Sequence, residues 1–101
     1  MIFMIVYRLE DKNGEGPFCH KDGTVRINPE IKFDCKWLYA FDDVSCFKRP
    51  SYRCFLYDDE FTLYEIEISH EIGPRGFDTH EVIFWPGHIV SKKVYEPKVE
   101  V

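Results

Sequence analysis

The clearest pattern along the chain is a strict alternation of apolar and acidic side chains that follows Phe61. The two sets are Tyr64, Ile66 and Ile68 against Glu65 and Glu67. Successive side chains of a strand point to opposite faces of the sheet, so this pattern predicts a strand with one buried and one solvated face. An apolar cluster on one face implies a sheet that packs against other elements.

Further strands are predicted at both ends of the chain. Residues 2–9 are rich in β-branched and aromatic side chains and are apolar on both faces up to Tyr7, which favours a central strand. Residues 80–85 form another apolar run, and the turn-forming pair Pro86-Gly87 separates it from a short strand at 88–90. The pattern therefore predicts strands that come together from the two ends of the sequence.

A tight hairpin is predicted around Asp22-Gly23, between the segments 17–20 and 24–27. Glycine adopts positive φ angles without steric cost, which suits the turn of a two-stranded hairpin.

Helix signals are confined to the middle of the chain. Asn28-Pro29-Glu30 resembles a helix start, which predicts a helix over residues 31–41. A second short helix is expected over residues 41–49, with Asp42 as its cap and Pro50 as its end, and a third over residues 51–57.

Together these elements predict one α+β domain over residues 1–101, with residues 96–101 as a frayed tail. The expected fold is a mainly antiparallel sheet of about four to six strands with one or two short helices. The predicted core residues are Ile5, Phe41, Phe47, Tyr64, Ile66, Ile68, Val82 and Phe84.

Charge is unevenly distributed. The formal net charge is −5, and residues 51–101 carry all of it because residues 1–50 are balanced. An acidic surface argues against binding to nucleic acid or to anionic membranes, both of which need basic side chains. It suits a partner protein with a basic surface.

The four cysteines contain no CxxC pair, so a zinc ribbon or a thioredoxin-type redox site is not indicated. The opening apolar run, residues 1–6, lacks a preceding basic segment and is too short for a signal peptide or a membrane span. We therefore expect a cytoplasmic protein with reduced thiols. The histidines and nearby acids lack the spacing of known metal motifs, so no metal ligand is predicted.

Five carboxylates are candidates for binding a basic partner through an acidic face of the sheet: Asp58, Asp59, Glu60, Glu65 and Glu67. Glu65 and Glu67 lie two residues apart and share one face of the predicted strand. The alternative is that these side chains only solvate an exposed sheet face, where charge is common.

Two short segments resemble signatures of the ADP-ribosyltransferase fold. These are Tyr7-Arg8 at the end of the first strand and Thr79–Gly87 around the last strands, with Thr79 in place of the usual Gln or Glu. The resemblance implies that Tyr7 and Arg8 would hold NAD and that Glu81 would be the catalytic carboxylate. It makes an ADP-ribosyltransferase-like enzyme, or a degenerate nucleotide-binding relative, one candidate. Outside this resemblance no cofactor is expected.

The overall layout is also similar to small proteins encoded by bacteriophages and other mobile elements. The segments behind this likeness include Tyr7-Arg8-x-Glu10, Gly16-Pro17-Phe18, Leu63–Ile66 and Glu81–Phe84. It implies a viral, anti-defence binding protein that inhibits a host protein in the host cytoplasm, as anti-CRISPR proteins do. A third candidate is a virion or assembly component.

Overall fold

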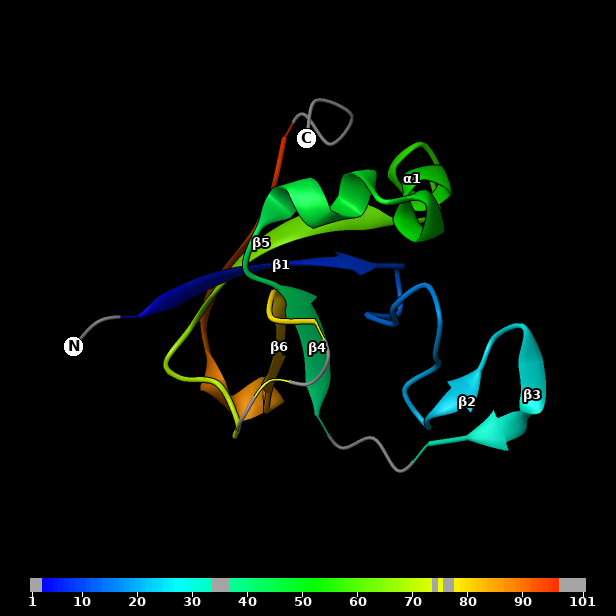
Figure 1. Ribbon diagram of the computed structural model, residues 1–101, viewed down its shortest axis with the longest axis horizontal. Coiled ribbons are helices and arrows are strands. Elements are labelled where there is room, and N and C mark those ends of the chain that lie inside the picture. The colour runs from blue at the N-terminus through cyan, green and yellow to red at the C-terminus, as the bar shows by residue number, and fades with distance from the viewer. Residues whose placement is uncertain (1–2, 34–36, 74, 76–77, 97–101) are drawn as a thin grey trace.

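The computed structural model describes residues 3–33, 37–73, 75 and 78–96. Its main element is a five-stranded antiparallel sheet with the order β6-β4-β1-β5-β7 (Figure 1). The strands are β1 (Met4–Glu10), β4 (Leu38–Phe41), β5 (Thr62–Ile68), β6 (Glu81–Phe84) and β7 (Ile89–Val94). The predicted α+β class with a mainly antiparallel sheet is confirmed.

β1 is the central strand, as its two-sided apolar pattern predicted. It pairs with β5 along its whole length, from Met4↔Ile68 to Glu10↔Thr62. On its other side it pairs with β4 only at Tyr7↔Phe41. In Figure 1 β4 runs away from β1 at a steep angle, in agreement with a ladder of one pair.

Both faces of the sheet bury apolar side chains. On β4 the neighbours Ala40 and Phe41 are both buried and, because strand side chains alternate, they serve opposite faces. The inner cluster consists of Val6, Ala40, Ile66, Ile68, Val82 and Phe84. The helical cluster consists of Leu9, Phe41, Cys46, Phe47, Leu56, Phe61 and Leu63.

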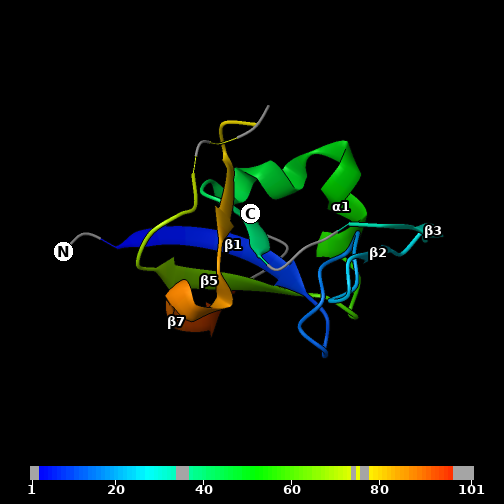
Figure 2. The ribbon, with the colours of Figure 1, turned by 90° about the horizontal axis from the view of Figure 1, so that it is seen from below.

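Two short helical segments cover the helical cluster. They are η1 (Val44–Lys48), a 3-10 helix, and α1 (Pro50–Leu56), and Figure 2 shows α1 on one side of β1 and β5 with β7 on the other. The predicted helix over residues 41–49 is shorter than expected, because Asp43 and not Asp42 caps it by accepting from the N–H of Ser45. Pro50 begins α1, where its missing N–H costs nothing.

The helix predicted over residues 31–41 is wrong. Asn28–Lys32 forms β3, which pairs with β2 (Thr24–Val25) in a separate two-stranded sheet, and residues 38–41 form β4. The cap-like Asn28-Pro29 signal is local, whereas pairing of β4 with both β1 and β6 buries Ala40 and Phe41. Residues 34–36 lie outside the described residues.

The predicted turn at Asp22-Gly23 is present. Gly23 has a φ of +90°, and a Cβ at this position would lie 1.8 Å from the carbonyl oxygen of Phe33. Both the angle and the close approach exclude any other residue without rearrangement. The bridge Cys19↔Val25 and the bond from Arg26 N–H to Phe18 O (2.9 Å) join the two sides of the turn.

The predicted core is confirmed at six of its positions, each buried: Phe41, Phe47, Ile66, Ile68, Val82 and Phe84. Ile5 is wrong, since it is 38% exposed, and Tyr64 is only partly buried. Leu63 was missed although it is fully buried on the opposite face from Ile66. One face of β5 packs in the inner cluster and the other packs in the helical cluster. The alternation of apolar and acidic residues predicts only one buried face.

Three cysteines, Cys19, Cys46 and Cys54, are free thiols, and Cys35 lies outside the described residues. The predicted tail also lies outside them from residue 97 on. Within the described part of the chain, no helix has the length and apolarity needed to cross a membrane.

Candidate functional site

A cavity of about 630 Å³ occupies the gap between β1 and β4. Its walls come from the second half of β1, from β4, from the loop of residues 14–21 and from the start of β7. Such a volume lies within the range of about 300–1,000 Å³ that is typical of small-molecule sites. The cavity lies where the ladder between β1 and β4 ends after one pair, so side chains of both strands line it.

Charged side chains form a chain along one end of this cavity. Arg8 Nε donates to Glu10 Oε2 at 2.8 Å, and its Nη1 donates to the carbonyl of Tyr39 at 2.9 Å. Lys92 on β7 donates to the other oxygen of Glu10 and lies 4.4 Å from the ring centroid of Tyr64. The Glu10 side chain is only 5% exposed, so both cations compensate a carboxylate that is nearly removed from water.

A second ionic group fixes the loop beside the cavity. The Asp11 carboxylate accepts the N–H groups of Asn13 (2.8 Å) and Glu15 (2.9 Å) and pairs with Arg26 at 2.7 Å. Burial alone would raise the pKa of Asp11, but these hydrogen bonds outweigh it and hold the pKa below its usual value. Asp11 therefore remains ionised and holds the loop in place.

The other end of the cavity contains Glu81 and Tyr52. Burial, together with the charge of Asp78, raises the pKa of Glu81. Burial and the nearby Glu81 charge raise the pKa of Tyr52 to about 12. A carboxyl with a raised pKa in a cavity is a feature of many functional sites, although buried structural groups show it too.

The structure divides the residues that the ADP-ribosyltransferase resemblance singled out. Tyr7, Phe41 and Glu81 form one cross-strand row, because Tyr7 pairs with Phe41 and Phe41 pairs with Glu81. Arg8, the neighbour of Tyr7, points to the opposite face, where it meets Glu10. Tyr7, Arg8 and Glu81 all line the cavity, but Arg8 and Glu81 approach it from opposite faces of the sheet. The NAD site stays a prediction.

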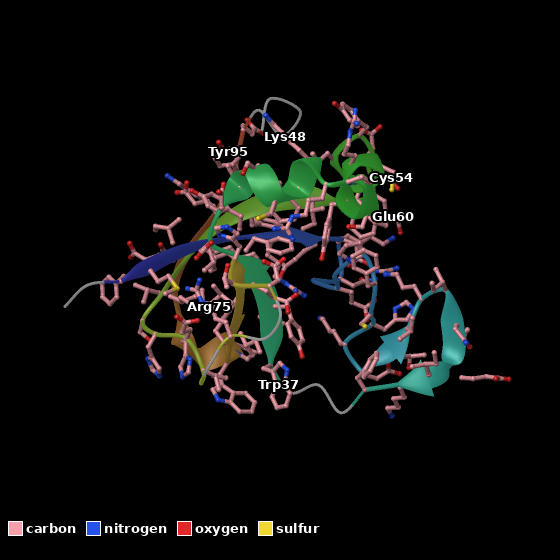
Figure 3. All side chains as sticks on the ribbon, in the orientation of Figure 1. Trp37, Lys48, Cys54, Glu60, Arg75 and Tyr95 are labelled. Carbon is pink, nitrogen blue, oxygen red and sulfur yellow. The ribbon has the colours of Figure 1, made fainter. Side chains whose placement is uncertain are left out.

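The predicted acidic band falls into two parts. Glu65 is 23% exposed and pairs with Lys93, its cross-strand neighbour on β7, at 3.1 Å. Asp58, Asp59 and Glu60 are all exposed on the turn between α1 and β5, and Figure 3 shows Glu60 beside α1. With a strand rise near 3.3 Å, Glu60 and Glu65 are separated by about 16 Å along the chain. The most exposed carboxylates thus lie on the turn and not on the sheet.

Tyr57 precedes this turn and is 65% exposed, one of the largest exposures of any aromatic side chain in the described residues. We call Tyr57–Glu60 the acidic turn. The segment directly follows α1, where the backbone carbonyls of the helix end carry partial negative charge. Its carboxylates therefore gain nothing from the helix, and a cation from outside would stabilise them.

Several polar residues form a network that no sequence pattern predicts. Asp42 accepts from Arg75 Nη1 (2.5 Å) and His80 Nδ1 (2.8 Å), and Arg75 also pairs with Glu71 at 2.9 Å. These bonds outweigh the effect of burial and lower the pKa of Asp42. The group ties Glu71, Arg75 and His80 to Asp42, the residue that follows β4. No spacing in the sequence predicts a contact between residues so far apart.

The histidines do not gather with acids into a metal site in the described part of the chain. The rings of His70 and His88 lie 3.7 Å apart, and His80 binds Asp42. No group of three or more His, Cys, Asp or Glu with metal-binding geometry occurs among residues 3–33, 37–73, 75 and 78–96.

Comparison of the chain with protein-family models, with curated proteins and with solved structures finds no match.

Proposed function

We propose that this chain is a small acidic binding protein that engages a basic surface of a partner protein through the acidic turn. The observation that supports this proposal best is the position of Tyr57, 65% exposed, directly before three exposed carboxylates. Tyrosine is enriched at protein interfaces because it offers a large apolar ring together with a hydroxyl group.

Ion pairing supports the same surface. Four other carboxylates each have a cationic side-chain nitrogen within 3.1 Å of an oxygen: Glu10, Asp11, Asp42 and Glu65. Within the described residues, Asp59 and Glu60 form no salt bridge, so their charge is available to a partner. A surface of one sign speeds encounter with an oppositely charged protein, by about 10- to 1,000-fold in strongly steered complexes.

The partner class comes from the sequence resemblance to small bacteriophage proteins. On that basis we propose that the partner is a host defence protein, inhibited as by an anti-CRISPR protein, in the host cytoplasm. A virion or assembly component would instead bind copies of itself. Light scattering on the purified chain separates these alternatives, because only the assembly component is expected to self-associate.

Charge reversal tests the acidic turn. Asp59→Lys with Glu60→Lys should slow association with a basic partner at least tenfold, because attraction becomes repulsion. Asp58 stays unchanged because its carboxylate accepts the N–H of Glu60 at 2.9 Å and shapes the turn. Surface plasmon resonance over a series of salt concentrations measures both the association rate and its screening.

The matched control is Glu65→Lys with Glu67→Lys, which changes the net charge equally but on the sheet. If the acidic turn is the interface, this control should affect association much less than the turn variant. The reverse order would place the interface on the sheet face. An affinity that ignores both variants and added salt would contradict an electrostatic interface altogether.

A further inference from the structure

The cavity between β1 and β4 contains charges that the acidic turn does not use. Its chain of Arg8, Glu10 and Lys92 holds two cations and one carboxylate, which leaves one positive charge in excess. The Arg8 side chain is only 12% exposed. Glu10 already pairs with Arg8, so the excess positive charge is shared between Arg8 and Lys92, and this end of the cavity favours an anion.

Arg8 has donors left for such an anion. It uses Nε for Glu10 and Nη1 for Tyr39, and no described residue accepts a hydrogen bond from Nη2. Gly16 lies alongside, since a Cβ there would be 3.6 Å from both terminal nitrogens. Because glycine has no side chain, the guanidinium is not covered from that direction. A guanidinium matches the shape of a carboxylate better than any other side chain does.

The other carboxylates of the cavity have other neighbours. Glu15 accepts from His20 Nδ1 at 3.1 Å and from the N–H of Lys21 at 2.6 Å. Glu81 lines the cavity beside Tyr52, at its other end. Glu10 is therefore the carboxylate that pairs with Arg8.

Aromatic rings provide the remaining surface of the cavity. Phe18, Phe33 and Tyr39 line it and are 40%, 53% and 38% exposed. Trp37 lines it as well, with its indole N–H donating to the Tyr39 hydroxyl at 2.8 Å, and Figure 3 shows it near the start of β4. Rings left open to solvent are stabilised when a flat apolar group packs on them.

We infer that this cavity binds a planar aromatic carboxylate. Its ring would pack among Phe18, Phe33, Trp37 and Tyr39, and its carboxylate would accept hydrogen bonds from Arg8. The acidic turn lies on other elements, so this site is independent of the proposed protein interface. The chain would then carry a small-molecule site in addition to its binding surface.

Calorimetry with two probes of the same shape tests the inference. Indole-3-acetate carries the carboxylate, and indole-3-acetamide replaces it with a neutral amide. Indole-3-acetate should bind saturably and at least about tenfold more tightly, since hydrogen bonds to charged groups contribute enough for that factor. Arg8→Gln should remove this preference, whereas Arg53→Gln, an exposed arginine of α1, should leave it unchanged.

A second variant keeps the test decisive if Arg8→Gln fails to fold. Gly16→Val places a branched side chain against the guanidinium and should weaken binding of indole-3-acetate at least tenfold. Its control, Gly87→Val, adds the same side chain where a Cβ meets nothing within 4 Å. Circular dichroism verifies that each variant is folded.

Three results would overturn the inference. Equal affinity for the two probes would show that the carboxylate is not recognised, and no saturable heat with either would show that the cavity is not such a site. Saturable binding of NAD without binding of indole-3-acetate would assign the cavity to a nucleotide.

Discussion

The two sides of β1 differ sharply in this protein. Toward β5 the strand is paired from Met4↔Ile68 to Glu10↔Thr62, and the side chains Val6 and Ile66 beside this ladder are fully buried. Toward β4 the ladder has a single pair, Tyr7↔Phe41, and a cavity of about 630 Å³ opens beyond it. One strand thus contributes to the core on one side and to a candidate site on the other.

This comparison shows how a small domain obtains a cavity without losing its core. A continuous ladder satisfies the backbone and brings apolar side chains together, which favours dense packing. Beyond the single β1–β4 pair, charged side chains take the place of apolar ones. Arg8 and Glu10 lie there and form an ion pair at 2.8 Å. We expect the paired side to provide stability and the open side to provide function.

The largest effect is expected on the paired side. Ile66→Ala removes a fully buried side chain from the inner cluster and should lower the free energy of unfolding by about 2–5 kcal/mol. Ile5→Ala, from the same ladder but 38% exposed, should cost clearly less. Urea denaturation followed by circular dichroism measures both. Equal losses would mean that Ile5 is as buried as the sequence pattern suggested.

An intermediate effect is expected on the open side. Glu10→Gln removes the charge that Arg8 and Lys92 share and should destabilise the fold by about 1.5–3 kcal/mol, the range for hydrogen bonds to charged groups. The control Glu30→Gln changes an exposed carboxylate on β3 and should stay within about 0.5 kcal/mol. An unchanged unfolding midpoint for Glu10→Gln would show that the ionic chain is not formed in solution.

The smallest effect is a dependence on pH. Burial raises the pKa of Glu81 in the folded state, so the folded protein binds a proton more readily than the unfolded chain. Stability is then highest at pH values below the ordinary glutamate pKa and falls as the pH rises toward the raised folded value. Glu81→Gln cannot ionise and should therefore be more stable than the wild type at pH 7, but not at pH 4.

Thermal unfolding of both proteins at these two pH values measures this difference. A wild type that gains stability relative to Glu81→Gln between pH 4 and pH 7 would show that a partner stabilises the Glu81 carboxylate. Such a result would support a functional role for the Glu81 carboxylate at the end of the cavity nearest Tyr52.

The acidic turn offers a comparison with the sheet carboxylates. Glu65 has Lys93 at 3.1 Å and the turn carboxylates Asp59 and Glu60 form no salt bridge within the described residues, although all three looked alike in the sequence. Exposed substitutions on the turn should change stability by no more than about 0.5 kcal/mol. A binding defect of the turn variant is then attributable to the surface itself.

Local sequence patterns were enough to predict β1, β5, β6 and the turn at Asp22-Gly23, but not β3 or β4. The alternation around Ile66, the apolar run of β1 and the glycine of the Asp22-Gly23 turn act over a few residues, and each is present in the structure. The helix predicted over residues 51–57 is present as α1, shifted by one residue toward the N-terminus. Short-range patterns were sufficient because backbone preference and side-chain period are local properties.

The faces that those elements bury, and the charges that meet, depend on how the strands assemble. Residues 38–41 form β4 because they pair with β1 on one side and with β6 on the other. The local signal at Asn28-Pro29 predicts a helix there. Glu10 and Lys92 are 82 residues apart in the sequence and form an ion pair. Arg8 and Tyr7 are neighbours in the sequence but point to opposite faces of the sheet, because side chains alternate along a strand. Contacts between residues so distant in sequence depend on strand order and register, which no local pattern contains.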